Sequence, residues 1–324
     1  MEAAVIVTYR CPSACQRCHT WQNPTAVHEE FSPALLEKLP ALSFCNVTGG
    51  EPLVRHDLPE IIDILLARSR RVVVSTSGYF TDQTMQLAER FPRLGIRVSL
   101  EGLPAASDRL RGMKDSFDHG LRTLLELTKR RHRDVGFSVT ISEENARDVP
   151  HLYRLARGMG WEFATAAVHN SDYFHKTDNR ITNREVVVAA LNELMCELLR
   201  SWRVKDWFRA YFNHGIVNYV QGRPRLLPCA AGSGVFFLDP RGEILPCNGM
   251  ERSLWYQSFG NLHDADFHTI WNSQRAATIR KTVSTCPKNC WMIGTVSPLL
   301  RANPLVAARW IVGAQARRLR GRQP

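Results

Sequence analysis

Residues 3–18 read AAVIVTYRCPSACQRC, an apolar, β-branched run that is followed by Cys11, Cys15 and Cys18. A run of this kind predicts a buried strand, and the cysteines come directly after it. Three cysteines can hold three corners of a [4Fe–4S] cube and leave the fourth iron open to bind and activate a further ligand. The stretch therefore indicates reactive metal chemistry at the end of the first strand.

Further apolar runs follow the first one at intervals that leave room for a helix between neighbours. The runs predict these strands: Ala3–Tyr9, Phe44–Thr48, Val72–Thr76, Ile96–Leu100, Val135–Ile141 and Glu162–Val168. The helix-period segments between them are Pro33–Leu39, Leu58–Ser69, Asp82–Phe91, Phe117–Arg130 and Ala146–Met159. Such alternation indicates βαβ units and a parallel sheet. We therefore predict an α/β fold, a partial (β/α)6 TIM-like barrel with its chemistry at the carboxyl ends of the strands.

The second half of the chain departs from this alternation. Long helices are predicted at Asn183–Arg200 and near Asp206–Val220, and a proline-containing loop follows them. Val235–Leu238 and Glu243–Leu245 flank Asp-Pro-Arg-Gly and predict a β-hairpin, and Phe267–Val283 predicts one helix. We place domain boundaries after residues 222 and 296, which gives a barrel domain (1–222), a small α+β domain (223–296) and a C-terminal tail helix (297–324).

The composition bounds the class of protein. The chain has 324 residues, 44% of them hydrophobic, which is enough for one large core with a smaller appendage. Nothing in it reads as a signal peptide or a membrane span, so we expect a cytoplasmic protein. Its nine cysteines then indicate metal ligands in a reducing compartment rather than disulfides. Seven of them form two groups, and Cys45 and Cys196 stand alone.

The net charge of +11 is concentrated at the C-terminal end. No acidic residue follows Asp266, whereas ten Lys and Arg residues do, which leaves a net charge of +1 for residues 1–266. We therefore expect no nucleic-acid groove across the main body. The tail from Pro304 combines a short apolar helix with a basic end. It suits peripheral contact with an anionic membrane or an acidic protein, although packing on the barrel explains it slightly better.

A second motif, Thr48-Gly49-Gly50-Glu51-Pro52, follows the second predicted strand. Adjacent glycines there let a ligand approach the backbone, and Glu51 can accept hydrogen bonds from an ammonium group. The chain resembles the radical S-adenosylmethionine (SAM) superfamily in two motifs, Cys-x3-Cys-x2-Cys after strand one and Gly-Gly-Glu-Pro after strand two. One departure is visible, since Arg17 stands where that family often has an aromatic residue before the third cysteine.

The resemblance implies a set of cofactors and a site. It implies that Cys11, Cys15 and Cys18 hold a SAM-binding [4Fe–4S] cluster whose open iron chelates the amino and carboxylate groups of SAM. The SAM contacts that it implies lie at successive strand ends, at Gly49, Gly50, Glu51, Ser75, Ser77, Ser99, Glu101, Thr140 and Asn145. The resemblance also implies that a flavodoxin or ferredoxin supplies the electron that cleaves SAM. The resulting 5′-deoxyadenosyl radical takes a hydrogen atom from the substrate.

Cys229, Cys247, Cys286 and Cys290 form the second cysteine group, and the predicted hairpin brings Cys229 and Cys247 together. Four cysteines can close a tetrahedral zinc site, so a zinc alternative stays open. The spacing Cys-x12-Gly-x4-Cys resembles the start of SPASM and twitch domains. Four cysteines then imply the shorter twitch version with one auxiliary [4Fe–4S] cluster, in a layout similar to that of 2-deoxy-scyllo-inosamine dehydrogenase.

A fully ligated auxiliary cluster cannot bind substrate through iron, but it can accept an electron. We therefore expect oxidation of a carbohydrate-like alcohol, for instance an aminocyclitol, aminoglycoside or cell-envelope sugar, with a general base near the substrate. The end of the sixth strand offers His169, Asp172 and Tyr173 as candidates. Epimerisation of such a sugar is the alternative. It needs a thiol as hydrogen donor, for which Cys45 and Cys196 are the candidates.

Two further hypotheses stay open. The first is modification of a ribosomally made peptide, such as thioether or carbon–carbon crosslinking. The four-cysteine count and the short segment before the first strand argue against it. The second is a zinc-stabilised, basic protein that binds nucleic acid with a salt-dependent affinity. Iron and sulfide analysis separates this last class from every radical SAM hypothesis.

Overall fold

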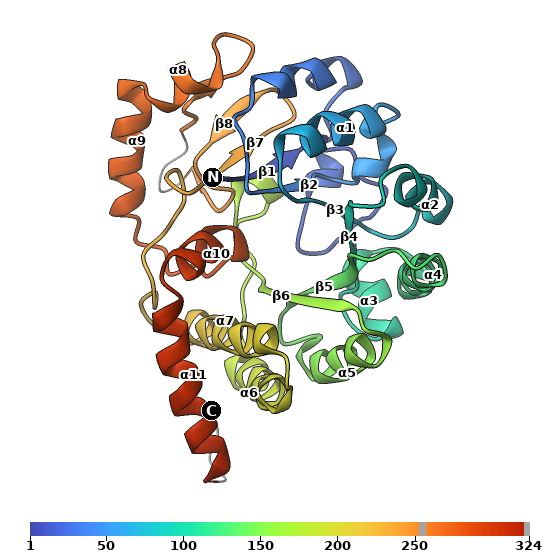
Figure 1. Ribbon diagram of the computed structural model, residues 1–324, viewed down its shortest axis with the longest axis vertical. Coiled ribbons are helices and arrows are strands. Elements are labelled where there is room, and N and C mark those ends of the chain that lie inside the picture. Colours follow the sequence, from blue (N-terminus) through green and yellow to red (C-terminus); the bar gives the residue numbers. More distant parts are fainter. Residues whose placement is uncertain (253–256, 321–324) are drawn as a thin grey trace.

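The computed structural model describes residues 1–252 and 257–320. Through these residues runs one sheet in the strand order β6-β5-β4-β3-β2-β1-β7-β8-β9. Its N-terminal strands, all parallel, are β1 (Glu2–Ile6), β2 (Phe44–Thr48), β3 (Val72–Thr76), β4 (Gly95–Ser99), β5 (Val135–Ile141) and β6 (Glu162–Ala167). Helices lie around the outside of this sheet (Figure 1). The predicted α/β fold with a partial (β/α)6 barrel is confirmed.

The helices between the strands cover the apolar face of the sheet. They are α1 (Leu58–Arg68), α2 (Thr81–Arg90), α3 (Pro104–Arg111), α4 (Ser116–Lys129) and α5 (Val149–Met159), and α6 (Arg184–Arg200) and α7 (Val204–Val220) follow β6. Residues of β2 show the division of faces, because Cys45 and Val47 are buried in the core while Asn46 and Thr48 point the other way. The segment at Pro33–Lys38 is a 3-10 helix, and α3 is a helix that the sequence pattern did not reveal.

The C-terminal hairpin extends the barrel sheet. Strand β7 (Val235–Leu238) pairs in parallel with β1, and β8 (Glu243–Leu245) and the short β9 (Gly260–Asn261) continue it in antiparallel fashion. The turn of the hairpin is held by Asp239, whose Oδ1 accepts from the amides of Arg241 (2.9 Å) and Glu243 (2.8 Å). Gly242 supplies the positive φ of +85°. The predicted hairpin is therefore present, and it is continuous with the barrel.

The single helix predicted for Phe267–Val283 is wrong. Two helices occupy this stretch, α8 (Phe267–Trp271) and α9 (Gln274–Ser284). Ser273 causes the break, because its backbone is extended and its Oγ accepts from the amide of Ala276 (3.1 Å) as the N-cap of α9. A chain of helical residues with a strong capping residue inside it reads as one helix by periodicity alone.

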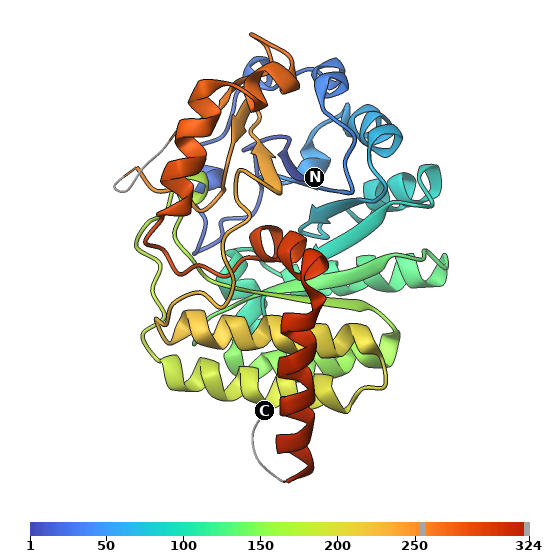
Figure 2. The same cartoon turned by 60° about the vertical axis from the view of Figure 1, so that its left-hand side comes forward.

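Two helices close the described chain, α10 (Ile293–Ala302) and α11 (Pro304–Leu319). Both views show α11 crossing α7 at a steep angle, with its far end projecting from the molecule (Figures 1 and 2). The predicted boundary after residue 296 falls within α10, and residues 321–324 of the predicted tail helix lie outside the described residues. The division into three units stays a prediction. Among the described residues, no helix has both the length and the apolar character needed to cross a bilayer.

Glu162, at the start of β6, ties that strand to α7. Its carboxylate pairs with Arg209 and, at 2.6 Å, with Lys205. Burial alone would raise the pKa of Glu162, but the charges of Arg209 and Lys205 outweigh it and lower the pKa to about 2. These ion pairs therefore stabilise the fold at pH values above the ordinary pKa of a glutamate. Their contribution is lost as the pH falls from about 4.5 towards 2.

We expect Glu162→Gln to lower the free energy of unfolding by about 2 kcal/mol at pH 7. Denaturant titrations of the wild type and the variant should converge as the pH falls from about 4.5 towards 2, because the wild-type carboxylate is then protonated. Glu185→Gln, on the exposed first turn of α6, is the control and should have little effect. A difference between wild type and Glu162→Gln that does not change with pH would contradict the assignment.

Candidate active site

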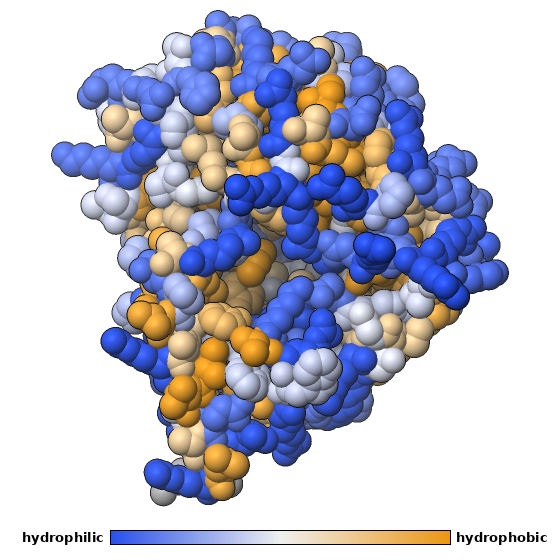
Figure 3. All heavy atoms as spheres, in the orientation of Figure 1, coloured by the Kyte–Doolittle hydropathy of each residue, from blue (hydrophilic) through white to orange (hydrophobic). Residues whose placement is uncertain are grey.

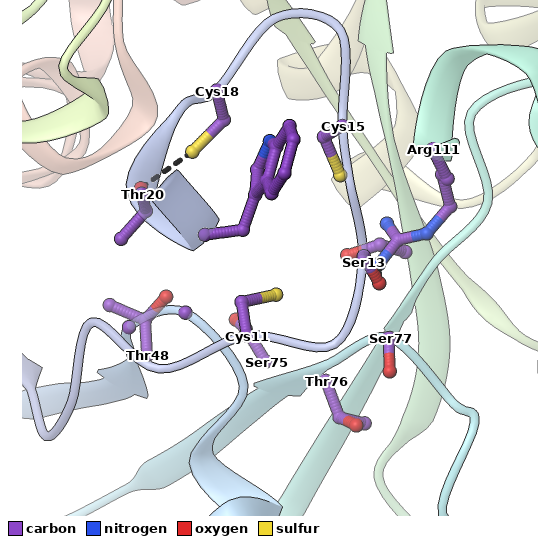
Figure 4. Close-up of a pocket in the computed structure, with 14 residues that line it drawn as sticks. Cys11, Ser13, Cys15, Cys18, Thr20, Thr48, Ser75, Thr76, Ser77 and Arg111 are labelled. Carbon is purple, nitrogen blue, oxygen red and sulfur yellow. Dashed lines mark hydrogen bonds between the residues drawn. The ribbon is translucent and has the colours of Figure 1, made fainter. Parts of the chain in front are cut away.

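A cavity of about 140 Å³ lies at the carboxyl ends of β2, β3 and β4. The loop after β1 contributes all three N-terminal cysteines, and Figure 4 shows their sulfurs arranged around the cavity. Its lining residues are Cys11, Ser13, Cys15, Cys18, Thr20, Trp21, Thr48, Gly49, Gly50, Ser75, Thr76, Ser77, Ser99 and Arg111. The structure thus brings the cysteine loop, the Gly–Gly turn and the strand-end serines together.

Gly49 and Gly50 are required by the backbone that leads to Cys11. Gly49 has a φ of +153°, and a Cβ on it would lie 2.4 Å from the carbonyl oxygen of Thr8. A Cβ on Gly50 would lie 2.2 Å from the carbonyl oxygen of Arg10 and 2.9 Å from the Cβ of Cys11. The amide of Gly50 donates to the carbonyl of Thr8 at 2.7 Å. The two glycines therefore let the cysteine loop and the β2 turn pack backbone against backbone.

Glu51 is fully buried and is absent from the cavity lining. Its Oε1 accepts from the Thr76 hydroxyl (2.9 Å) and the amide of Leu53 (3.2 Å), and its Oε2 accepts from the amide of Ser77 (2.6 Å). The carboxylate thus holds the turn after β2 against the end of β3. The contact with an ammonium group that the sequence suggested stays a prediction.

The other expected SAM contacts divide into two sets. Ser75, Ser77 and Ser99 line the cavity, whereas Glu101, Thr140 and Asn145 do not. The Oε2 of Glu101 accepts from the amide of Thr140 at 2.8 Å, and the Asn145 side-chain amide donates to the carbonyls of both residues. These three side chains fix the ends of β4 and β5 relative to each other. Their contact with SAM stays a prediction.

Arg111, the last residue of α3, is a cavity residue that sequence analysis missed. Its guanidinium is buried and lies beside Cys15 and Ser13 (Figure 4), with Nη2 3.4 Å from the Ser13 hydroxyl. Its Nε has no hydrogen-bond partner among the described residues. Burial raises the pKa of the Cys15 thiol to about 12, and the charge of Arg111 acts in the opposite direction. A buried cation with a spare donor suits an anionic ligand.

The cysteine loop is held from two sides. The amide of Gln16 donates to the carbonyl of Leu110 at 3.0 Å, so the end of α3 supports the loop directly. On the other side Arg17 reaches the end of β5, where its Nη1 donates to the carbonyl of Thr140 at 3.0 Å and its Nη2 contacts Ser142 and Glu144. Arg17 therefore anchors the loop in this chain.

Residues 169–179, which we call the strap, connect the first site to the C-terminal part. The carbonyl of Phe174 accepts from the amide of His19 at 2.7 Å, and the Asn179 side chain donates to the carbonyl of Arg17 at 3.1 Å. The Tyr173 hydroxyl donates to the carbonyl of Gly49 at 3.1 Å. The strap therefore contacts both the cysteine loop and the Gly–Gly turn.

The three candidate bases all lie on the strap, and none of them lines either of the two cavities described here. Burial lowers the pKa of His169 to about 4, so its ring is neutral at pH 7, and burial raises the pKa of Tyr173. The His169 Nε2 and one oxygen of Asp172 are buried and have no hydrogen-bond partner among the described residues. Their role as a base stays a prediction.

A second cavity, of about 470 Å³, contains the other cysteine group. Cys229 precedes β7, Cys247 follows β8, and Cys286 and Cys290 follow α9. The full lining is Arg225, Leu226, Leu227, Pro228, Cys229, Ala231, Cys247, Gly249, Val283, Ser284, Cys286, Lys288 and Cys290. The hairpin brings Cys229 and Cys247 to one place, as the sequence predicted.

Lys288 joins this second cavity to the strap. Its ammonium donates to the carbonyls of Gly249 (2.8 Å) and Asn170 (3.1 Å) and pairs with the carboxylate of Glu251. The strap is also bound to this side by the amide of Asp172, which donates to the carbonyl of Met250 at 2.9 Å. One segment is thus hydrogen-bonded to both cysteine sites.

We expect Lys288→Met to loosen the strap, because two carbonyls and one carboxylate lose their donor. A loss of about 1.4 kcal/mol in local stability raises about tenfold the fraction of molecules whose strap is locally unfolded. Trypsin should therefore cleave at Lys176 and Arg180 about tenfold faster. Mass spectrometry of timed digests of the anaerobically purified protein measures this rate. Lys281→Met, at an exposed position on α9, is the matched control. Equal cleavage rates in the two variants would refute the link.

The two lone cysteines lie outside both cavities. Cys45 is fully buried on β2, on the opposite face from Thr48, which lines the first cavity, and burial raises its pKa to about 12. Cys196 is half-buried on α6. These positions lend no support to either residue as a hydrogen donor to a substrate.

The residues present fit the cofactors that the sequence suggested. Three thiols and a buried guanidinium with a free donor surround the first cavity, and four thiols line the second. The thiols of each group line one common cavity, and iron–sulfur clusters are held by cysteine thiolates.

Comparison with known proteins agrees with this assignment. The model of the radical SAM superfamily matches residues 5–156, and that of the SPASM iron–sulfur cluster-binding domain matches residues 229–291. PqqA peptide cyclase of Xanthomonas axonopodis pv. citri (strain 306) is 25% identical over 298 residues, which cover 88% of this chain and 77% of the relative. Fe-coproporphyrin III synthase of Methanosarcina barkeri (strain Fusaro / DSM 804) is 33% identical over 161 residues. These cover 46% of this chain and 39% of that relative.

A solved structure described as native anSMEcpe with bound AdoMet and Cp18Cys peptide has the same fold. It aligns with a TM-score of 0.63 and 11% identity, over 96% of this chain and 99% of that one. The matched domains account for a SAM-binding [4Fe–4S] cluster, SAM itself and an auxiliary iron–sulfur cluster as cofactors. The chain therefore contains a radical SAM superfamily domain over residues 5–156 and a C-terminal SPASM iron–sulfur cluster-binding domain over residues 229–291.

Proposed function

We propose that this radical SAM enzyme modifies a peptide. The observation that carries the proposal is the likeness to PqqA peptide cyclase, which extends over 88% of the chain. The likeness to Fe-coproporphyrin III synthase covers 46% of the chain, too little of it to bear on the substrate. Peptide crosslinking, the class of reaction that the name of the cyclase denotes, is the reaction we assign.

This proposal replaces alcohol oxidation as the leading hypothesis. That hypothesis rested on the number of auxiliary cysteines, which limits the cluster but does not identify a substrate. The relatives favour the peptide-modifying alternative. The epimerase alternative depended on Cys45 or Cys196 as hydrogen donor, and neither lines a cavity. The zinc-stabilised nucleic-acid-binding alternative gives way to the family match.

In the first cavity, Cys11, Cys15 and Cys18 would bind three irons of the SAM-binding cluster and leave the fourth position for SAM. When bound, the cluster and SAM supply a one-electron cleavage that provides a radical able to take a hydrogen atom from a C–H bond. Arg111 would face the carboxylate of SAM, because a buried guanidinium with a free Nε gains most from an anion. Ser75 and Ser99 would offer hydroxyls to its polar groups.

The chain must also keep water from the site during this chemistry. The strap is placed to do so, since Tyr173 and Phe174 bind the Gly–Gly turn and the cysteine loop from the C-terminal side. In the second cavity, Cys229, Cys247, Cys286 and Cys290 would complete the ligand set of one cluster. A fully ligated cluster would carry electrons and would not hold the peptide through iron.

The test starts from anaerobically reconstituted protein whose iron and sulfide contents correspond to two clusters. The protein is incubated with SAM, dithionite and deuterated peptides synthesised from reading frames that lie beside its gene. We expect deuterium in 5′-deoxyadenosine and a peptide product that has lost two hydrogens. A deuterated aminocyclitol serves as the second arm. Transfer from the aminocyclitol and none from the peptides would overturn the proposal in favour of alcohol oxidation.

A further inference from the structure

The helix α11 uses only one of its faces to pack on the molecule. Ala307, Ile311 and Ala314 are buried at a spacing of three to four residues, which puts them on one face of the helix. The ring of Trp310 stacks on that of His214 of α7, with 4.8 Å between the ring centroids. The Gln315 side chain donates to the carbonyl of Leu199 at 2.8 Å and so holds the far half of α11 near the end of α6. On the opposite face of the described helix, large apolar side chains are exposed instead.

That opposite face carries a stripe of large apolar side chains. Leu305, Val312 and Leu319 are 70%, 71% and 81% exposed. A spacing of seven residues on a helix puts them within about 40° of one another and along about 21 Å of its length. Figure 3 shows hydrophobic atoms along α11 with hydrophilic atoms beside them. Single exposed apolar residues are ordinary, but an aligned set on a projecting helix marks a contact surface.

The charges on α11 that flank this stripe are all positive. Arg309 and Arg320 are exposed on the same side of the helix, and Arg317 lies nearby. No acidic residue follows Asp266 in the sequence, so nothing on α11 offsets them. Near the far half of α11, after the end of α6, Trp202 is 85% exposed. Aliphatic, aromatic and arginine side chains on one amphipathic helix and its neighbour are the composition of an interfacial membrane anchor.

We propose that the outer face of α11, together with Trp202, docks on an anionic lipid surface. A second copy of this chain is a poor occupant, because it would bring two sets of uncompensated arginines together. The helix also projects away from the rest of the molecule, where a flat surface can reach it (Figure 2). A bilayer interface accepts such a face without shape complementarity. The proposal does not depend on the identity of the substrate.

The test is co-sedimentation of the full-length, cluster-loaded protein with vesicles. One set is made of phosphatidylcholine alone, and the other of phosphatidylcholine and phosphatidylglycerol in equal parts. We expect binding to the anionic vesicles only, weakened by added salt. Arg309→Gln and Arg320→Gln should each lower the partition coefficient about fivefold. Val312→Asp with Leu319→Asp should lower it about tenfold or more, because the stripe then carries the wrong charge.

The matched control is Val27→Asp, which replaces another exposed valine far along the chain from α11. It should leave the partition coefficient unchanged, and all variants should keep the iron content and circular dichroism of the wild type because the positions are exposed. Equal binding to both vesicle sets, or binding that survives Val312→Asp with Leu319→Asp, overturns the proposal. Capture by a soluble acidic protein in place of vesicles, or a dimer that these substitutions dissolve, overturns it as well.

Discussion

Replacing Cys11, Cys15 or Cys18 with alanine is expected to remove one of the two clusters and to reduce 5′-deoxyadenosine formation by more than about 100-fold. At metal sites, loss of a group that is hydrogen-bonded to a ligand already lowers metal affinity or activity by about 10- to 100-fold, and loss of a ligand itself lowers it further. The three thiols share one cavity, and no fourth cysteine lies among its lining residues to take the vacant place. The measurement is iron and sulfide content of anaerobically reconstituted protein, followed by SAM cleavage with dithionite.

Two matched variants sharpen this prediction. Cys196→Ala changes a half-buried cysteine outside both cavities and should keep both clusters and the full rate. Cys247→Ala should remove the auxiliary cluster alone, because its thiol lines only the second cavity, and SAM cleavage in the absence of substrate should persist. If Cys11→Ala kept the iron content and cleavage rate of the wild type, the assignment of the first cavity would be wrong.

Gly50→Ala is the second substitution for which we expect a large effect. The added Cβ would lie 2.2 Å from the carbonyl oxygen of Arg10 and 2.7 Å from its carbonyl carbon, and both are backbone atoms that cannot swing aside. Relief of the clash must move the β2 turn away from the cysteine loop. Because a shift of about 1 Å at a reacting site can cost about 100-fold, SAM cleavage should fall by about that factor. The variant should also bind iron less tightly.

The control for Gly50→Ala is Gly158→Ala on α5, where an added Cβ meets nothing within 4 Å. Alanine is favoured over glycine inside a helix by about 1 kcal/mol, so this variant should be as stable as the wild type or more stable. Melting temperature and SAM cleavage are measured for both. A Gly50→Ala protein with normal cleavage would mean that the loop and the turn move together and that their packing does not set the site.

Local sequence was enough for the parts of the fold whose signal is repeated along the chain. The parallel strands were predictable because β-branched runs such as Val72–Thr76 recur at βαβ spacing. Both limits of each strand from β2 to β6 lie within one residue of the expected ones. The break at Ser273 escaped prediction, because periodicity does not register a cap inside a helical stretch.

The site divides in the same way. The cysteine groups and the Gly–Gly turn carry their chemistry in their spacing, so the sequence identified them and the family match followed. It did not identify Arg111, because the end of α3 reads as a charged surface segment until the fold places it against Cys15. The glycines were expected to admit a ligand. The structure shows that they first admit the backbone of Thr8 and Arg10.

The sequence by itself determined the chemistry available to this protein, since ligand type and spacing are local properties of the chain. Tertiary structure alone decided which groups meet. It placed Glu51 inside the protein as a link to Thr76, joined β7 to β1, and ran the strap from one cysteine site to the other. It also left the apolar side chains on one face of α11 exposed to solvent. These are contacts between residues distant in sequence, and burial and hydrogen bonding choose them only when the whole chain packs.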